Sequence, residues 1–195
     1  GTDFTYQKQI YHIGAMGEHQ VKNAILAIEV AKRLRIPAKA IVSGLNRARQ
    51  PLRMEVISRQ PLIIVDGAHN REKMQTTVNS TQALLRSGAY GQVHLILGFS
   101  GDKMWPQMVR QLVTLKPASV TGTRNTVNPF RTVAHPKEIA RLCRQHMKEA
   151  RVNIFLDPAA ALHSARKRLR KNDILLITGS IFLSGQIRAR LTNDT

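Results

Sequence analysis

The protein has 195 residues, of which 43% are hydrophobic and 22% are charged. This composition is ordinary for a globular protein and excludes a chain that is disordered throughout. Its 30 Lys and Arg residues outnumber 12 Asp and Glu residues, which gives a net charge of +18. Such an excess favours anionic partners, and nucleic acid is the first class to consider. Aromatic residues are only 5% of the chain and do not alternate with basic residues, which argues against nucleic acid.

No targeting or membrane segment is visible in the sequence. No apolar run reaches the roughly 18 residues that a membrane span needs, and no stretch has the layout of a signal peptide. The single cysteine, Cys143, excludes an internal disulfide and favours a reducing compartment. We therefore expect a cytoplasmic protein with no membrane partner.

The first 50 residues read as the end of a preceding domain. Residues 4–13 alternate enough to predict a single strand without a visible partner, and glycines follow it. Apolar residues recur with helical spacing over 18–34, and residues 38–46 predict a second, shorter helix.

From Pro51 onwards, predicted strands alternate with predicted helices. The strands are expected at 53–58, 61–66, 93–98, 119–122, 152–156 and 174–178. The helices are expected at 71–87, 103–115, 134–149, 158–171 and 181–191. This alternation predicts an α/β fold with a mostly parallel sheet and helices on both faces. With a boundary near residues 49–51, residues 51–195 would form one compact domain.

Polar residues follow four of the predicted strands. They are Asp66, His69 and Asn70 after the first of these strands, Ser100, Gly101, Asp102 and Lys103 after the second, Thr121, Thr123 and Arg124 after the third, and Thr178, Gly179 and Ser180 after the last. Because the carboxyl ends of parallel strands meet at one edge of a sheet, we expect the four loops to converge on one cleft. Carboxylates there can accept hydrogen bonds from ribose hydroxyls, and cationic side chains can bind carboxylate or phosphate.

Several common site types are excluded by the sequence. Nothing matches the phosphate-loop pattern G-x-x-x-x-G-K-[ST] or the dinucleotide pattern G-x-G-x-x-G. The seven His residues and the one Cys have no zinc-ligand spacing, so no metal site is expected in this chain. Ser180 lacks the G-x-S-x-G context of a hydrolase nucleophile.

Six segments nevertheless match the pattern of a known family in order and spacing. They are GEHQVKNA at 17–24, PLRME at 51–55, DGAHN at 66–70, DK at 102–103, DP at 157–158 and ITGSIFLSGQIR at 177–188. On these motifs the chain resembles the C-terminal part of the folylpolyglutamate synthase and dihydrofolate synthase family, within the Mur ligase superfamily. DGAHN and the TGS segment are the specific signals.

The resemblance implies an ATP-dependent ligase that joins a folate carboxylate to the amino group of L-glutamate through an acyl phosphate. The implied substrates are ATP, L-glutamate and folate or dihydropteroate. It also implies a Rossmann-like Mur ligase C-terminal domain at residues 51–195, preceded by a remnant of the central ATPase domain at residues 1–50. The phosphate loop and the Mg²⁺ ligands are expected in a missing N-terminal ATPase domain, without which the fragment would be inactive.

The resemblance assigns roles to six residues. Asn23 matches the contact to adenine, Arg53 the contact to the ATP phosphates, and Asp66 the contact to the ribose. His69 and Ser180 match glutamate-binding positions, Lys103 is a candidate partner for a glutamate carboxylate, and Arg53 and His69 are the catalytic candidates. The structural alternatives are an ion pair of Arg53 with Glu55 or Asp66, helix capping by Asp66, Asn70 or Ser180, a packed His69, and solvated Asn23 and Lys103.

Three positions depart from the family pattern: Leu52 replaces a glycine, Arg71 a proline and Met104 an aspartate. The alternative functions are a ligase for a cell-wall precursor, a basic nucleic-acid-binding module and an inactive interaction domain. One further hypothesis concerns the basic run at residues 166–171, in which Arg166, Lys167 and Arg168 would favour anionic polyglutamate tails.

Overall fold

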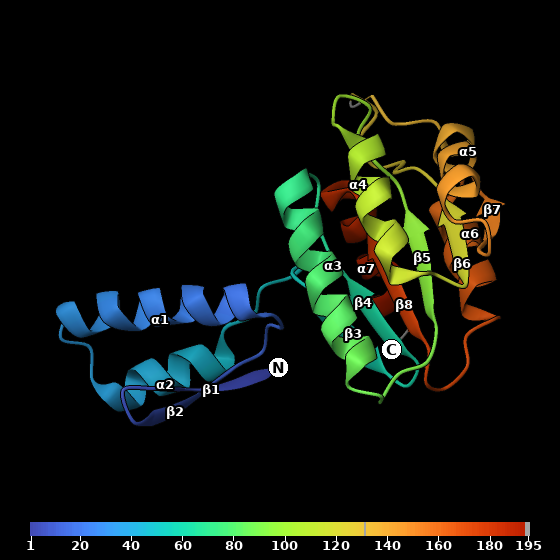
Figure 1. The fold of residues 1–195 in the computed structure, drawn as a ribbon. Coiled ribbons are helices and arrows are strands. Elements are labelled where there is room, and N and C mark those ends of the chain that lie inside the picture. Colours follow the sequence, from blue (N-terminus) through green and yellow to red (C-terminus); the bar gives the residue numbers. More distant parts are fainter. Residues whose placement is uncertain (131, 194–195) are drawn as a thin grey trace. The chain divides into compact units, whose positions relative to one another are not determined.

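The computed structural model of the protein describes residues 1–130 and 132–193 (Figure 1). The chain forms two compact units, Gly1–Glu55 and Val56–Thr195, and each is described by itself below. The division falls a few residues after the expected boundary near residues 49–51. The assignment of the two units to an ATPase remnant and a C-terminal domain stays a prediction.

The first unit consists of a hairpin and two helices. Its elements are β1 (Thr2–Tyr6), β2 (Gln9–Ile13), α1 (Glu18–Arg33) and α2 (Ala38–Arg47). Both helices are close to their predicted bounds. Tyr11, Ile28 and Ile41 form the buried centre of this unit, and the Phe4 ring stacks on Tyr11 at 5.6 Å between centroids.

The expectation of a single unpaired strand over residues 4–13 is wrong. β1 and β2 pair antiparallel, with Thr2 opposite Ile13, and only two residues connect them. These residues, Gln7 and Lys8, have φ angles of 47° and 66°, the left-handed conformation that two-residue hairpin turns of this type require. Glycine and asparagine usually mark such turns, so a Gln-Lys pair left no signal in the sequence.

The second unit is a six-stranded sheet with helices on both faces. Its strands are β3 (Glu55–Arg59), β4 (Leu62–Val65), β5 (Val93–Leu97), β6 (Ser119–Gly122), β7 (Arg151–Ile154) and β8 (Ile174–Thr178). Its helices are α3 (Arg71–Arg86), α4 (Trp105–Leu112), the 3₁₀ helix η1 (Val113–Leu115), α5 (Pro136–His146), α6 (Pro158–Arg166) and α7 (Ile181–Asn193).

The sheet order is β3-β4-β8-β5-β6-β7, and every pairing from β4 to β7 is parallel. The expected α/β class with a mostly parallel sheet is therefore confirmed. All residues of β4, β5 and β8 are buried, because helices cover both faces of these central strands.

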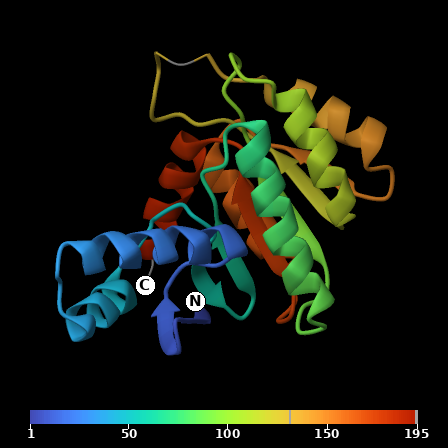
Figure 2. The same ribbon diagram turned by 60° about the vertical axis from the view of Figure 1, so that its left-hand side comes forward.

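The helices form two layers. α3 packs on α4 and α4 on α5, whereas α6 packs on α7 (Figures 1 and 2). Several of these helices begin as the sequence predicts: Asp157 accepts hydrogen bonds from the amides of Ala159 and Ala160, and Pro158 occupies the first helical position of α6. No helix within the described ranges is long and apolar enough to cross a membrane.

A buried polar network fixes the amino edge of the sheet. His94 Nδ1 lies 2.7 Å from the Ser119 hydroxyl oxygen, and His94 Nε2 lies 3.3 Å from Asp173 Oδ2. The latter contact lacks hydrogen-bond geometry. Asp173 also accepts hydrogen bonds from the backbone amides of Gln92 and Arg170, so this network joins the starts of three strands. The polar loops predicted to carry function lie at the opposite, carboxyl edge.

Candidate functional site

Glycines allow the tips of the central strands to approach one another closely. A Cβ atom added to Gly179, directly after β8, would lie 2.6 Å from the Gly98 carbonyl oxygen and 2.6 Å from the Phe99 ring. A Cβ added to Gly98, directly after β5, would lie 2.9 Å from the carbonyl oxygen of Thr123, which follows β6. The backbone at the tips of β8, β5 and β6 is therefore in direct contact, as the convergence of the loops requires.

Asp66 holds the turn that follows β4. It is 5% exposed, and its Oδ1 accepts hydrogen bonds from the Ala68 amide at 2.9 Å and the Thr77 hydroxyl at 2.7 Å. The Thr178 hydroxyl at the end of β8 makes a longer contact of 3.4 Å with the same oxygen. The N-cap of α3 is Asn70, whose side chain accepts from the Lys73 amide, so Asp66 fixes the turn instead of capping the helix.

His69 is held in one tautomer by the same turn. Its Nδ1 lies 2.8 Å from the Gly67 carbonyl oxygen, and because a carbonyl can only accept, Nδ1 carries the proton. Its Nε2 lies 3.2 Å from the Lys73 ammonium group and accepts from it. The neutral ring therefore presents a basic nitrogen to a neighbouring cation, which is a position that a substrate amino group could also take.

His69 and Lys103 line one pocket of about 440 Å³ between the starts of α3 and α4. Asn70 and Asp102 also contribute to its wall. The Lys103 ammonium group lies 3.5 Å from Asp102 Oδ2, and the lysine side chain remains 40% exposed. The structure thus brings two of the predicted glutamate-binding residues together, with a cation and an imidazole facing the same space.

A second group of polar side chains lies at the tips of β6 and β8. Four buried side-chain atoms there have no hydrogen-bond partner among the described residues: Thr123 Oγ1, Arg124 Nε, Asn125 Nδ2 and Ser180 Oγ. All four can donate a hydrogen bond, and Ser180 is 2% exposed. Buried donors normally have partners, so their arrangement fits a ligand rich in acceptor oxygens, such as a carboxylate.

The sequence assigned a glutamate-binding role to Ser180, placed Thr123 and Arg124 at the expected cleft without such a role, and did not single out Asn125. Thr123 and Arg124 belonged to the polar residues expected after one strand, but no motif marked them as ligand-binding. Asn125 gave no signal of its own. Their common feature, burial without a partner, exists only in the folded chain.

The other two predicted residues, Asn23 and Arg53, belong to the first unit. Asn23 is exposed on α1, and its amide nitrogen lies 3.5 Å from Gln20 Oε1. Arg53 is half-buried and forms no ion pair with another described residue of the first unit, so the expected alternative of a pair with Glu55 is not observed. The alternative of a pair with Asp66, which belongs to the second unit, stays a prediction. Glu55 instead accepts a hydrogen bond from the Leu52 amide at 2.9 Å.

The backbone around Arg53 has an unusual conformation. Leu52 and Met54, its two neighbours, have φ angles of 60° and 46°. This left-handed region is one that glycine adopts without strain, which agrees with the glycine that the resemblance leads us to expect in place of Leu52. The turn therefore presents the arginine in a defined backbone geometry.

The described residues contain no cluster of three or more His, Cys, Asp or Glu side chains able to hold a metal ion. The four buried atoms at this edge without a partner among the described residues, Thr123 Oγ1, Arg124 Nε, Asn125 Nδ2 and Ser180 Oγ, are hydrogen-bond donors, which fit anionic oxygens and not Mg²⁺. The location of the Mg²⁺ ligands outside this chain stays a prediction.

Comparison with known proteins identifies relatives of this architecture. The model of the Mur ligase, glutamate ligase domain, matches residues 52–181. A probable bifunctional folylpolyglutamate synthase/dihydropteroate synthase from Haloferax volcanii is 30% identical over 182 residues, which cover 92% of this chain and 20% of that protein. The dihydrofolate synthase/folylpolyglutamate synthase of Bacillus subtilis is 26% identical over 183 residues, covering 90% of this chain and 40% of that protein.

Among solved structures, the folylpolyglutamate synthase of Mycobacterium tuberculosis, in complex with ADP and AMPPCP, matches with a TM-score of 0.79 and 22% identity. The match covers 93% of this chain and 42% of that one. The chain thus spans less than half the length of each of these proteins. The resemblance drawn from the motifs is confirmed, and the chain belongs to the Mur ligase family, in which it comprises the glutamate ligase domain.

Proposed function

We propose that the protein is the C-terminal part of an ATP-dependent folate-glutamate ligase, in which the carboxyl edge of the sheet binds the incoming L-glutamate. The observation that carries this proposal is the set of four buried donors at Thr123, Arg124, Asn125 and Ser180. Relatives named as folylpolyglutamate synthases support the folate-glutamate reaction over other ligase reactions.

L-glutamate has two carboxylates and one ammonium group, and the two polar groups of the site match these charges. The buried donors would accept one carboxylate, with the Arg124 guanidinium contributing charge. Lys103, in the adjacent pocket with His69, would pair with the other carboxylate. Two separated cations fix the orientation of an amino acid better than one, because each carboxylate then has its own partner.

His69 would act on the amino group of the substrate. An ammonium group cannot attack a carbonyl carbon, so it must lose a proton first. The Gly67 carbonyl holds the proton of His69 on Nδ1, which leaves Nε2 as the acceptor, and in the free protein the Lys73 ammonium occupies that acceptor. The substrate ammonium would replace Lys73 there and transfer its proton to Nε2.

The carbon that is attacked would belong to an acyl phosphate formed when the folate carboxylate takes the terminal phosphate of ATP. The attack of the glutamate nitrogen forms the amide bond and releases inorganic phosphate. Mg²⁺, when bound, would neutralise phosphate charge in this reaction. Arg53, presented by its left-handed turn, would stabilise the negative charge that the phosphate group carries, and Asn23 would contact adenine.

Asp66 fits the ribose role only in part. Its Oδ1 already accepts three hydrogen bonds within the protein, and the residue is nearly fully buried. These contacts support a role of Asp66 in holding the turn that carries His69 and Asn70. They support a contact between Asp66 and ATP less directly.

The proposal is tested in the full-length ligase, because residues 1–195 would not position ATP and the folate by themselves. Arg124→Gln and Ser180→Ala should each raise the KM for L-glutamate by about tenfold or more, while the KM for ATP changes by less than about twofold. Arg110→Gln, an exposed arginine on α4, is the matched control for Arg124→Gln. An unchanged KM for glutamate in both site variants would contradict the glutamate-binding assignment.

Two alternative functions are separated by the choice of substrate. If ADP release by the full-length ligase depends on a cell-wall precursor and not on folate, the folate-glutamate assignment is wrong.

ADP release by residues 1–195 alone, with folate, glutamate and ATP, would contradict the proposed inactivity of the fragment. Tight duplex binding that is unaffected by Asp66→Ala would favour a nucleic-acid-binding module.

A further inference from the structure

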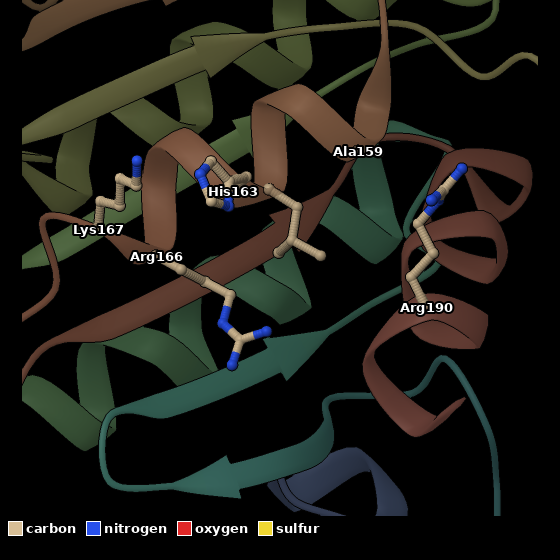
Figure 3. A pocket seen from close by; sticks show the side chains of 6 residues that line it. Ala159, His163, Arg166, Lys167 and Arg190 are labelled. Atoms are coloured by element: carbon tan, nitrogen blue, oxygen red, sulfur yellow. The ribbon is translucent and has the colours of Figure 1, made fainter. Parts of the chain in front are cut away.

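A surface pocket of about 370 Å³ lies between α6 and α7, on the face of the sheet away from α3 and α4 (Figure 3). It is lined by Ala159, Leu162, His163, Arg166, Lys167 and Arg190. None of these residues belongs to the glutamate site described above. The pocket is therefore a separate feature of the domain.

The pocket has an uncompensated positive charge. Arg166, Lys167 and Arg190 are permanent cations near neutral pH, and no acidic side chain lines the pocket. None of the three forms an ion pair with a residue in the described part of the chain. Cations that line one pocket repel one another, and an anion bound between them would relieve this repulsion.

Helix geometry places the cations on two walls. His163, Arg166 and Lys167 are three and four residues apart on or at the end of α6, so they share one side of that helix, and Arg190 comes from α7 (Figure 3). Arg166 and Arg190 lie in the last turns of α6 and α7, where helix dipoles favour cations by about 0.3–1 kcal/mol per residue. Helix dipoles explain single basic residues in last turns, but they do not explain a hollow lined by cations of two helices.

The apolar part of the lining limits the type of ligand. Ala159 and Leu162 contribute aliphatic surface, and the residues that line the pocket include His163 but no Phe, Tyr or Trp ring that could stack on a base. A small ligand or a chain end with anionic groups joined by short spacers suits this combination better than a nucleic-acid duplex. Cations on two walls suit two or more anionic groups better than one.

We propose that the pocket between α6 and α7 binds a multivalent anion, whose carboxylate or phosphate groups interact with Arg166, Lys167 and Arg190. The proposal does not depend on the folate-glutamate assignment. If that assignment also holds, an oligo-γ-glutamate tail is the carboxylate source, because it carries one carboxylate per residue along a flexible chain.

The experiment uses two multivalent probes and one monovalent probe. Binding of inorganic triphosphate, penta-γ-glutamate and acetate to the protein is measured by isothermal titration calorimetry at a fixed ionic strength. We expect saturable binding of at least one multivalent probe and none of acetate. Preference for triphosphate identifies phosphate as the ligand chemistry, and preference for pentaglutamate identifies carboxylate.

A matched pair of double variants locates the binding. Arg166→Gln/Arg190→Gln should weaken binding of the preferred probe by about tenfold or more. Arg86→Gln/Arg110→Gln removes the same charge from exposed positions on α3 and α4 and should weaken it by less than about twofold. Thermal unfolding of both variants without probe checks that each is folded.

Three results would overturn the proposal. The first is the absence of saturable binding of both multivalent probes to the unaltered protein. The second is an equal loss of affinity in the two double variants, which would show a diffuse charge effect. The third is duplex DNA binding that excludes the probes and is equally strong in both variants, which would show a nucleic-acid surface. If the protein binds triphosphate but not penta-γ-glutamate, the oligo-γ-glutamate tail is not the ligand, while the proposed anion pocket stands.

Discussion

A buried carboxylate organises the first loop of the site. Asp66 accepts hydrogen bonds from the Ala68 amide in its own turn and from the Thr77 hydroxyl on α3, and its backbone oxygen accepts from the Ser184 hydroxyl on α7. One residue thus ties β4 to a helix on each face of the sheet. The orientation of His69 depends on the turn that these bonds hold.

Asp66→Ala should lower the free energy of unfolding by about 3 kcal/mol, because it leaves the Ala68 amide without its acceptor and removes the bond from the Thr77 hydroxyl, which keeps only the Lys73 carbonyl oxygen at 3.0 Å. Asp66→Asn should cost about half as much, because the amide oxygen can replace Oδ1 as the acceptor. Urea unfolding followed by circular dichroism measures both values. A loss below about 0.5 kcal/mol for the alanine variant would show that the bonds do not hold the turn.

Cys143 is a second residue whose environment has a measurable consequence. It is fully buried on α5, and burial raises the pKa of its thiol from 9.0 to about 12. The thiol is therefore protonated in the folded protein at neutral pH, and only the thiolate is reactive. We expect the free thiol to resist alkylation in the native state.

The raised pKa also predicts a pH effect on stability. In the unfolded chain the thiol ionises above about pH 9, whereas in the folded protein it stays protonated until about pH 12, so its stabilising contribution is complete below pH 9 and is lost between these values. As the pH rises across this window, the loss of this contribution should decrease the free energy of unfolding by up to roughly 1.4 kcal/mol per pH unit. The measurement is the slope of the free energy of unfolding against pH, compared between the unaltered protein and Cys143→Ala, in which this contribution is absent. Equal slopes would contradict the prediction.

At the scale of elements, the strand tips determine where the loops meet. Gly179 has a φ of 105°, and its Cα faces the Gly98 carbonyl so closely that a methyl group has no space. Parallel strands alone would place the four loops at one edge, but these glycines bring the tips of β8, β5 and β6 into contact. Thr123 and Ser180, which carry two of the buried donors, directly follow these tips.

Gly179→Ala should destabilise the protein by about 3 kcal/mol or more, from backbone strain and from overlap with Gly98 and Phe99. Gly88→Ala is the matched control: Gly88 also has a positive φ, 72°, but nothing lies within 4 Å of an added Cβ. Gly88→Ala should lower the free energy of unfolding by about 1 kcal/mol, from conformational strain alone. Chemical unfolding of both variants measures the difference, and equal losses would show that close packing at the strand tips contributes nothing.

At the scale of the whole molecule, positive charge is the dominant electrostatic property. With a net charge of +18, the folded chain experiences self-repulsion that the few acidic residues do not balance. The pocket between α6 and α7 is a local concentration of this charge. Among the described ion pairs, Lys22–Glu18, Lys32–Glu29 and Lys103–Asp102 are partly exposed and contribute little.

Salt should therefore stabilise the protein. Raising NaCl from about 20 mM to about 300 mM shortens the Debye length from roughly 20 Å to roughly 6 Å, which screens the repulsion between basic side chains. The melting temperature should therefore rise by about 3 °C or more. Differential scanning calorimetry in NaCl and in KCl checks the effect and separates ionic strength from a specific cation. A falling melting temperature would show that exposed ion pairs outweigh the net repulsion.

The sequence by itself determined the α/β class, the positions of most strands and helices, and the family. Hydrophobic runs such as 61–66 and the amphipathic periods of the helices are local patterns, and the DGAHN and TGS motifs are local too. The hairpin of β1 and β2 was missed because backbone conformation at Gln7 and Lys8, rather than residue type, makes the turn.

Only the tertiary structure decided how the polar residues are used. Sequence order cannot show that Asp66 accepts hydrogen bonds from Thr77 and Thr178, because these residues are distant in the chain. Nor can it show that Asn125 Nδ2 and Ser180 Oγ are buried without a hydrogen-bond partner among the described residues. Likewise, only the structure shows that Arg166 and Lys167 from the run at residues 166–171, but not Arg168, line a pocket together with Arg190. Periodicity along a chain records which residues are buried, whereas hydrogen-bond partners and charge clusters are set by the packing of distant segments.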